Sequence, residues 1–511
     1  MREALESYVL VFGVGVAVAI GAKRLNIPYN VALVVIGLLL VFANVLPHSP
    51  LEPDAVLIAF LPVLIFESAL AADYDSLRSA RRPILALALP GVVFSLFATA
   101  VAAMFTLELP FTAALLLGAL LSITDTVSVI LAFRSVKVPH RLAAIMEGES
   151  LFNDGTSLVL VSVTTAIVET GHFDGATTTR SLFLAIVGGI GIGACAGALG
   201  SAALRRAADP LTGILTSGVL VFATSLLAER IHASPVIAVV VVGLAVGRSA
   251  RRALEPSHVL ALQNFWEAIG FSINVLLFVL VGMQIDARML LTEAGAILAA
   301  TLALHVGRAV AVYGCFAIMR SFGRYEVPTR WQHVMVFGNI KGALSMAAVL
   351  ALPAELPHRD RLVAVVFGVT FVTLLTQALP FRRFLLWIGV TSSHDDLFDR
   401  ARARLIAARR GQVELDGMLA TGIMSRAEHA ERRAAFQRTV IESEQALRTP
   451  EADAADDVII DGALLAAQKA ALVDAARRGL VASETADREI AVIDRRLLRL
   501  GNHHQTPETT T

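Results

Sequence analysis

Long apolar runs, bounded by proline, glycine or charged residues, occupy the first 390 residues of the chain. A membrane-spanning helix needs about 20 mostly apolar residues, although shorter runs can also span. The runs have the length of helices and lack the ten-residue alternation of membrane strands, so they predict an all-α integral membrane protein. The thirteen candidate spans are residues 6–22, 30–47, 54–71, 83–104, 110–133, 141–169, 181–204, 210–228, 233–247, 261–282, 293–319, 330–352 and 361–389.

Charged residues are concentrated after these runs. Residues 391–511 hold 37 of the 86 Lys, Arg, Asp and Glu side chains, although they make up less than a quarter of the chain. This shift predicts a transmembrane domain over residues 1–390 and a soluble tail over the remainder. The tail is predicted to be helical over residues 396–446 and 459–500, with a break near Pro450. It is either a solvated tail or an element that regulates the protein or stabilises a dimer.

The basic residues of the loops predict the orientation of the chain in the cell membrane. If the N-terminus is outside, the inner loops carry sixteen Lys or Arg residues and the outer loops carry five. Short cytoplasmic loops of membrane proteins are enriched in Lys and Arg. The asymmetry therefore predicts an outside N-terminus and, after an odd number of spans, a cytoplasmic tail.

The overall charge and the glycine pattern exclude some partners. The formal net charge at pH 7 is zero, which gives no basis for a nucleic-acid partner. The sequence contains no nucleotide-binding glycine motif. We therefore expect no nucleic-acid partner. We also expect no cofactor and no enzymatic activity, with the lipid bilayer as the surroundings of the first domain.

Six ionisable residues fall deep inside the predicted spans, where each costs about 2.5–3.5 kcal/mol to insert. They should therefore face one another or water rather than lipid. Four are acids and two are bases, so at least two carboxylates lack a basic partner within the set. Such a carboxylate binds a proton or recruits a cation. The six are Glu67, Asp125, Glu149, Asp154, Arg308 and Lys341.

Two interpretations of this set stay open. Buried ion pairs that only fix helix register would explain Arg308, and a pair of Glu149 with Lys341, as well as a functional role does. The other three acids fit an ion site better, because their distances from the helix ends place them near the middle of the bilayer. On the sixth span, Ser150 and Asp154 share a helix face, and together they offer the hard oxygen ligands that a small cation prefers.

Two spans are interrupted. Ser-Ile-Thr-Asp-Thr at 122–126 breaks the fifth span, and Phe-Gly-Asn-Ile-Lys-Gly at 337–342 breaks the twelfth. Each lies in the fifth span of a six-span half, and two such halves separated by a seventh span insert with opposite orientation. Interrupted helices at matching places of an inverted repeat indicate the ion site of a secondary transporter. Asp125 would offset the positive half-helix ends there, and Lys341 the negative ones.

Four motifs occur in these spans in a recognisable order. Residues 147–155, Glu-Gly-Glu-Ser-Leu-Phe-Asn-Asp-Gly, contain a Glu-Ser-x-x-Asn-Asp signature. The other three motifs are Leu-Ile-Phe-Glu at 64–67, Thr-Asp-Thr at 124–126 and Gly-Asn-Ile-Lys-Gly-Ala-Leu-Ser at 338–345. Over residues 1–390 the set resembles the monovalent cation–proton antiporters, a family that includes NhaP-type bacterial exchangers and animal sodium–proton exchangers.

The resemblance implies a site and an activity. Asp154 would be the carboxylate that binds either sodium or a proton, and the loaded site would move across the membrane between a core bundle and a scaffold by alternating access. The residues that the resemblance places at the ion site are Asp154, Glu67, Ser150, Thr124, Asn153 and Asp125, with sodium held by the first four. The family also implies a homodimer.

Other positions refine this expectation. Asn153 would stand where electrogenic relatives have a first acid, which implies electroneutral exchange of one sodium ion for one proton. Glu149 would pair with Lys341. Thr126 replaces the usual proline of the motif, and Lys341 replaces the usual arginine, which loses a bidentate fork toward a carboxylate.

Alternatives remain at this point. Potassium or lithium could replace sodium as the exchanged ion, because neither ligand number nor cavity size can be read from a sequence. A cation channel is an alternative of another class, although no repeated filter motif is present. An intramembrane hydrolase with an Asp125–Asp154 dyad is a further one, although the motifs that accompany such acids are missing.

Overall fold

A computed structural model of the chain describes residues 2–25, 28–42, 55–171, 175–207, 209–284, 287–322, 327–390 and 393–447, together with 465, 468–469, 472, 485 and 488–494. Every regular element in these ranges is a helix, which confirms the all-α prediction. Contacts divide the chain into two compact units, Met1–Thr391 and Ser392–Thr511.

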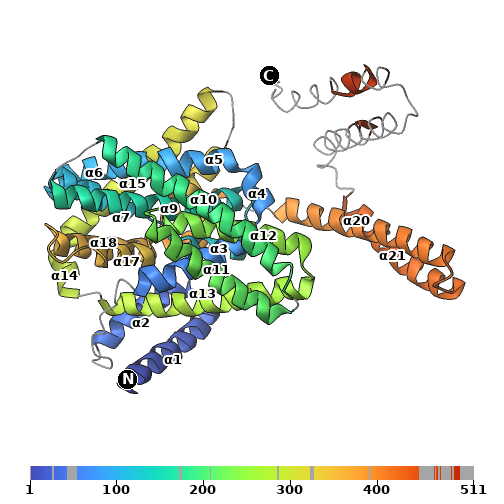
Figure 1. The fold of residues 1–511 in the computed structure, drawn as a ribbon, viewed down its shortest axis with the longest axis horizontal. Coiled ribbons are helices and arrows are strands. Elements are labelled where there is room, and N and C mark those ends of the chain that lie inside the picture. Colours follow the sequence, from blue (N-terminus) through green and yellow to red (C-terminus); the bar gives the residue numbers. More distant parts are fainter. Residues whose placement is uncertain are drawn as a thin grey trace. The chain divides into compact units, whose positions relative to one another are not determined.

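Two groups of helices make up the unit Met1–Thr391. We name the first the core bundle. In it α6, α7 and α15 run side by side (Figure 1), while α9 packs against α7 and α18 against α15. The core bundle consists of α5 (Arg81–Ala86), η2 (Leu87–Gly91), α6 (Val92–Leu107), α7 (Phe111–Ser122), α8 (Thr126–Val136), α9 (His140–Thr170), α15 (Ala294–Ser321), α16 (Thr329–Phe337), α17 (Ala343–Leu350), α18 (Arg359–Thr373), η3 (Leu374–Ala378) and α19 (Phe381–Ile388).

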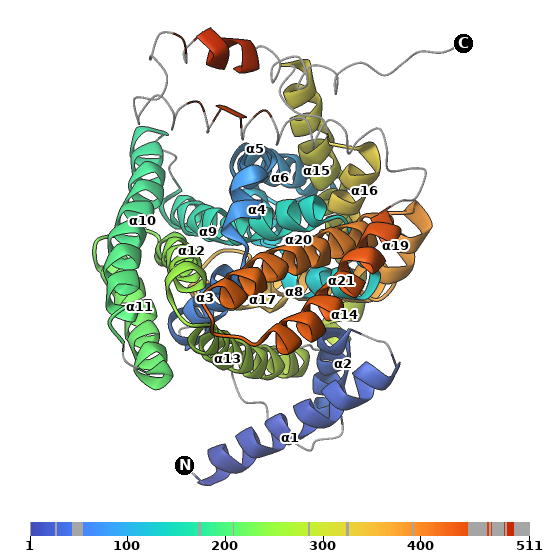
Figure 2. The same ribbon diagram turned by 90° about the vertical axis from the view of Figure 1, so that its right-hand side faces the viewer.

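The second group is named the scaffold bundle. Its helices α10, α11 and α12 pack together, and Figure 2 shows α10 and α11 along one edge. The two bundles meet where α9 touches α10 and α12, and where α17 touches α13. The scaffold bundle consists of α1 (Arg2–Leu25), α2 (Tyr29–Phe42), η1 (Ala55–Phe60), α3 (Leu61–Ala71), α10 (Gly175–Leu204), α11 (Pro210–Arg230), α12 (Pro235–Ala253) and α13 (Pro256–Gln284). Short helices α4 (Tyr74–Ser79) and α14 (Ala287–Thr292) precede α5 and α15.

Within the described residues, eight helical runs are long and apolar enough to cross a membrane, and three shorter apolar helices accompany them. Two predicted spans fall outside both groups. The helix α12 ends in a basic segment that contains Arg248, Arg251 and Arg252, and the span 330–352 is divided into the short helices α16 and α17. The count of thirteen spans therefore stays a prediction. The eight runs are Arg81–Leu107, Phe111–Phe133, His140–Thr170, Thr179–Leu204, Pro210–Arg230, Pro256–Leu280, Ala294–Ser321 and Arg359–Ala378.

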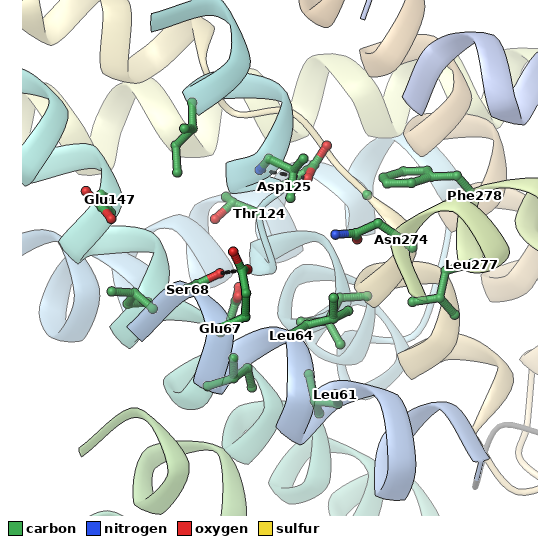
Figure 3. Close-up of a pocket in the computed structure, with 18 residues that line it drawn as sticks. Leu61, Leu64, Glu67, Ser68, Thr124, Asp125, Glu147, Asn274, Leu277 and Phe278 are labelled. Atoms are coloured by element: carbon green, nitrogen blue, oxygen red, sulfur yellow. Dashed lines mark hydrogen bonds between the residues drawn. The ribbon is translucent and has the colours of Figure 1, made fainter. Parts of the chain in front are cut away.

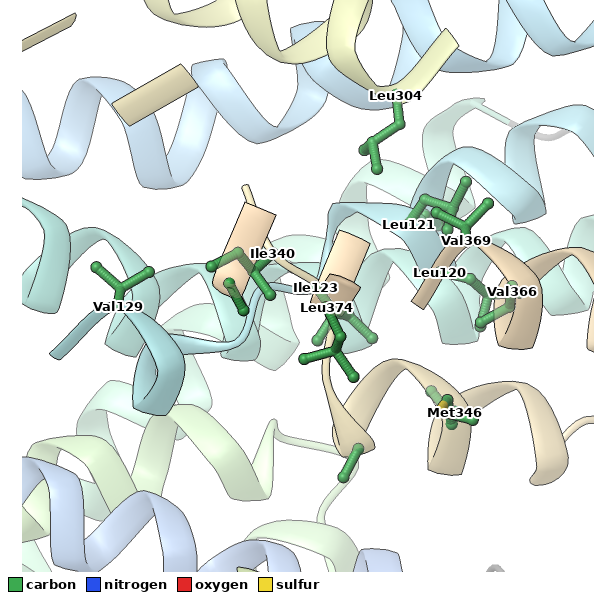
Figure 4. Close-up of a cluster of buried hydrophobic side chains, with 14 of the residues drawn as sticks. Leu120, Leu121, Ile123, Val129, Leu304, Ile340, Met346, Val366, Val369 and Leu374 are labelled. Atoms are coloured by element: carbon green, nitrogen blue, oxygen red, sulfur yellow. The ribbon is translucent and has the colours of Figure 1, made fainter. Parts of the chain in front are cut away.

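The two predicted interruptions are confirmed. The chain leaves the helical form between α7 and α8, at residues 123–125, and between α16 and α17, at residues 338–342. The unwound segments touch, because the backbone N–H of Asp125 donates to the carbonyl oxygen of Ile340 at 2.8 Å. Ile123 and Ile340 lie close together among buried side chains of the core bundle (Figure 4). Apolar packing thus holds two non-helical segments against each other inside the protein.

The unit Ser392–Thr511 begins with a helical hairpin of α20 (Ser393–Ala420) and α21 (Arg426–Leu447). Arg409 donates to Glu444 across the hairpin at 2.8 Å. Between the two helices, Ser425 and Glu428 form a reciprocal capping arrangement, which starts α21. The predicted break near Pro450 and most of the predicted helical stretch 459–500 lie outside the described residues.

Candidate ion-binding site

Asp125 ends the first interruption and starts the helix that follows it. Its Oδ1 accepts a hydrogen bond from the backbone N–H of Val127 at 3.1 Å, so the carboxylate caps α8. A carboxylate at this position satisfies a backbone donor that has no partner inside the helix, and it faces the positive end of the helix dipole. Asp125 therefore stabilises the N-terminus of α8.

Lys341 lies in the second interruption and reaches the first. Its Nζ donates to the carbonyl oxygen of Ile123 and to Asn339 Oδ1, each at 2.9 Å. The side chain is fully buried. Ile123 directly follows α7, so the donor lies at the helix end where carbonyl groups lack partners. The expected pairing of Lys341 with Glu149 is wrong, because Nζ donates instead to oxygens of the two interruptions.

Glu149 pairs instead with Arg308. The two guanidinium nitrogens Nη1 and Nη2 donate to Glu149 Oε1 and Oε2 at 2.7 and 2.9 Å, and Nε donates to the carbonyl of Met335 at 3.1 Å. Both side chains are buried. This bidentate pair joins α9 to α15, and the bond to Met335 adds α16. The planar fork of arginine explains why it, rather than lysine, takes the carboxylate.

Asp154, on α9, has no such partner for one of its oxygens. Its Oδ1 is buried and accepts no hydrogen bond from the described residues. One turn earlier on α9, the Ser150 hydroxyl lies 3.1 Å from the hydroxyl of Thr124. A buried carboxylate oxygen without a donor is costly unless a proton or a cation occupies it. Asp154 is therefore a carboxylate with one buried oxygen that accepts no hydrogen bond from the described residues.

Asn153 lies on a different side of α9 and holds the first interruption. Its amide donates to the carbonyl of Ser122 at 2.9 Å and to the Thr124 hydroxyl at 3.2 Å. Its Oδ1 accepts from the hydroxyl of Ser157 at 2.6 Å. Asn153 was expected among the ion-site residues, but it lies outside the lining of the cavity described next. Its link to the cavity is the hydrogen bond to Thr124, which is a lining residue.

A cavity of about 100 Å³ lies between the two bundles and collects most of the predicted site residues. Thr124, Asp125 and Asp154 line it from the core bundle, and Glu67 lines it from α3 of the scaffold bundle. Figure 3 shows Glu67, Thr124 and Asn274 directed toward the same space. Ser150, expected as a sodium ligand, is not among the lining residues, and its hydroxyl lies 3.1 Å from that of Thr124. The interruption and α9 thus bring residues from distant parts of the sequence to one cavity.

The oxygen groups around the cavity suit a small cation. No group of three His, Cys, Asp or Glu side chains that could hold a metal ion occurs among the described residues. A cation here would therefore combine carboxylate oxygens with hydroxyl or carbonyl oxygens. Such hard oxygen ligands are typical of alkali and alkaline-earth ions.

Two amides at the site were missed by the sequence analysis. Asn274 of α13 lines the cavity, and Asn30 of α2 donates to Asp125 Oδ2 at 3.1 Å. Both are neutral, so a search for charges inside apolar runs passes over them. Their signal is weaker but present, because a primary amide inside a membrane helix also needs partners.

Comparison with known proteins adds independent information. The family model "Sodium/hydrogen exchanger, transmembrane" matches residues 9–387. The chain is 38% identical to the Na(+)/H(+) antiporter NhaS2 of Synechocystis sp., over 97% of this chain and 94% of that protein. It is 34% identical to the Na(+)/H(+) antiporter ApNhaP of Aphanothece halophytica, over 81% of this chain and 80% of that protein.

A solved structure has a similar fold. The sodium proton antiporter MjNhaP1 from Methanocaldococcus jannaschii superposes with a TM-score of 0.66 at 18% sequence identity, covering 75% of this chain and 98% of that chain. At this identity the likeness concerns the fold. The family model matches most of the membrane unit, and the described residues include long apolar helices. The chain is therefore a multi-pass membrane protein that belongs to the sodium/hydrogen exchanger family.

Proposed function

We propose that the protein exchanges sodium for protons across the cell membrane, with Asp154 as the group that binds either ion. The observation that carries this proposal is the buried Oδ1 of Asp154, which has no partner among the described residues, on a residue that lines a cavity between the two bundles. A bound proton or sodium ion would remove the free-energy cost of burying that oxygen without a partner. One carboxylate cannot hold both ions at once. Family membership and the names of the curated relatives support sodium and protons as the two exchanged ions.

The proposed sodium ligands are Asp154, Glu67, Ser150 and Thr124. Asp154 and Glu67 would contribute negative charge, while the two hydroxyl residues would contribute neutral oxygens. Asp125 would act beside the ion as the cap of α8, and Asn153 would orient Thr124 through its hydrogen bond at 3.2 Å.

The division of the cavity's lining residues between the two bundles supports alternating access. Glu67 and Asn274 belong to the scaffold bundle, whereas Thr124 and Asp154 belong to the core bundle. A movement of one bundle against the other would therefore change which face of the membrane reaches the cavity. Because Asn153 replaces a second acid beside Asp154, each cycle would trade one sodium ion for one proton without net charge movement.

The membrane setting completes the proposal. The N-terminus would lie outside and the unit Ser392–Thr511 in the cytoplasm, as the loop charges predict. Large apolar side chains on α10 and α11, among them Phe183, Leu199, Leu215 and Val219, are exposed in the single chain. They would face lipid or a second copy of the chain in a homodimer.

Opposing ion gradients in sealed vesicles test the proposed function. Purified protein is reconstituted with a pH indicator inside, and sodium is added outside. Sodium-driven alkalinisation or acidification that depends on the direction of the gradient would support exchange. Repeating the experiment with potassium or lithium in place of sodium shows which of the three cations the protein exchanges for protons. Sodium flux that proceeds without coupled proton movement would indicate a channel and contradict the proposal.

A further inference from the structure

Asn30, near the start of α2, is bonded to the first interruption. Its Nδ2 donates to Asp125 Oδ2 at 3.1 Å and to the Ser128 hydroxyl, and Ser128 donates to the same carboxylate oxygen. Asn30 is fully buried, and its Oδ1 has no hydrogen-bond partner among the described residues. Because an ionised carboxylate offers only acceptors, the amide nitrogen must be the atom that faces Asp125.

This contact crosses from one bundle to the other. A Cβ added at Gly37 would lie 2.2 Å from the Val279 carbonyl oxygen, and one added at Gly282 would lie 2.2 Å from the Val34 carbonyl oxygen. Two helix backbones approach this closely only where glycine removes the side chain. The helix α2 is therefore fixed to α13 and moves with the scaffold bundle. Asp125 caps α8 in the core bundle, so any displacement of one bundle past the other stretches the Asn30 contact.

The unpaired oxygen of Asn30 argues against a purely structural role. Most buried polar side-chain atoms have a hydrogen-bond partner, and an exception in a folded protein needs an explanation. Here the nitrogen has two acceptors and the oxygen has none among the described residues. The contact favours this one arrangement of the bundles, and the amide is not fully satisfied in it.

We propose that Asn30 is a positioning residue that latches the scaffold bundle to the cap of α8 and so stabilises this conformation over the one that opens to the opposite face. The inference rests on the proposed exchange function. If a latch stabilises one state, its loss lowers apparent ion affinity on the face to which that state opens. It raises the affinity on the other face, since affinity scales with the population of the competent state.

The test measures the apparent KM for sodium on each face, in right-side-out and inverted membrane vesicles, for wild type and Asn30→Leu. Leucine has the same branching of heavy atoms, is somewhat bulkier, and lacks the donor. We expect opposite changes on the two faces, with the ratio of the two KM values shifted by about tenfold, the factor expected for one hydrogen bond to a charged group.

Two matched variants distinguish the latch from general damage. Ser128→Ala removes one of the two acceptors of Asn30 but leaves its bond to Asp125, so it should shift the KM ratio in the same direction as Asn30→Leu, but by less. Ser217→Ala removes the bond from Trp266 Nε1 at 2.9 Å, which lies within the scaffold bundle. It should leave the ratio unchanged.

The outcomes are separable. Exchange by wild type with an unchanged KM ratio in Asn30→Leu would overturn the latch alone, as would the same ratio shift in Ser217→Ala. Absence of sodium-driven proton movement in wild type would overturn the proposed function itself. If Asn30→Leu does not fold, Asn30→Ser, which is too short to span the gap to Asp125, takes its place with the same expected ratio shift.

Discussion

At the scale of single residues, Asp154 differs from the buried acids Asp125 and Glu149 because one of its oxygens lacks a donor among the described residues. Asp154→Asn should reduce sodium–proton exchange to the level of empty vesicles, because asparagine keeps the volume but cannot cycle a proton. Exchange is measured by sodium-driven pH change in proteoliposomes. Asp209→Asn is the control: it makes the same chemical change at an exposed helix cap that bonds Thr212 at 3.0 Å, so exchange should persist. Exchange retained by Asp154→Asn would remove this residue from the mechanism.

The Glu149–Arg308 pair gives a second prediction at this scale. Arg308→Ala should lower the free energy of unfolding by about 3–5 kcal/mol, the cost of leaving one partner of a buried ion pair uncompensated. Thermal unfolding in detergent measures the loss. Arg252→Ala breaks a pair with Asp75 whose side chains are both more than half exposed, so it should change stability little. Equal effects of the two substitutions would contradict a structural role for the buried pair.

How far the sequence predicts single residues depends on their charge. The insertion cost of a charge identified Glu67, Asp125 and Asp154, and the structure brings all three to one cavity. Pairing was not predictable, because Glu149 could reach a base on either of two helices and only the packing of α9 against its neighbours decides between them. The neutral amide of Asn30 was missed, because it carries no comparable signal in the sequence.

At the scale of elements, the two interruptions depend on Lys341. Lys341→Met should lower stability by about 1–3 kcal/mol, because Asn339 Oδ1 loses its Nζ donor and the Ile123 carbonyl keeps only the longer bond from Ser345. It should also impair exchange, since Thr124 follows Ile123 in the same unwound segment. Lys341→Arg, which retains a donor, should preserve more exchange. Measurement combines thermal unfolding with vesicle transport, and full transport by Lys341→Met would contradict the role given to this contact.

The sequence predicts helices well here because lipid and the protein interior both require long apolar runs with internally paired backbones. The interruptions at 123–125 and 338–342 were also predictable, since polar residues and glycine stand in otherwise apolar spans. The hairpin at the start of the tail was missed, although Gly422 and the Ser425–Glu428 cap mark its turn. In an Ala- and Arg-rich segment, a turn changes the composition too little to stand out.

At the scale of the whole molecule, exchange should be electroneutral. Asn153 supplies no second titratable acid beside Asp154, so one carboxylate trades one proton for one monovalent cation. The test imposes a membrane potential on proteoliposomes with valinomycin under a fixed sodium gradient. Rates and end-points should be insensitive to the potential. A rate that follows the potential would show net charge movement, and it would indicate that Asp125 or Glu67 also titrates during the cycle.

The most direct test of competition at Asp154 counts the protons released when sodium binds. Purified protein in weakly buffered detergent solution is titrated with sodium chloride at a pH where the sodium-free site is protonated, with choline chloride as the control. The account predicts release of about one proton per bound sodium ion in wild type, and none from Asp154→Asn. Sodium binding to wild type without proton release, or the same release from Asp154→Asn, would contradict it.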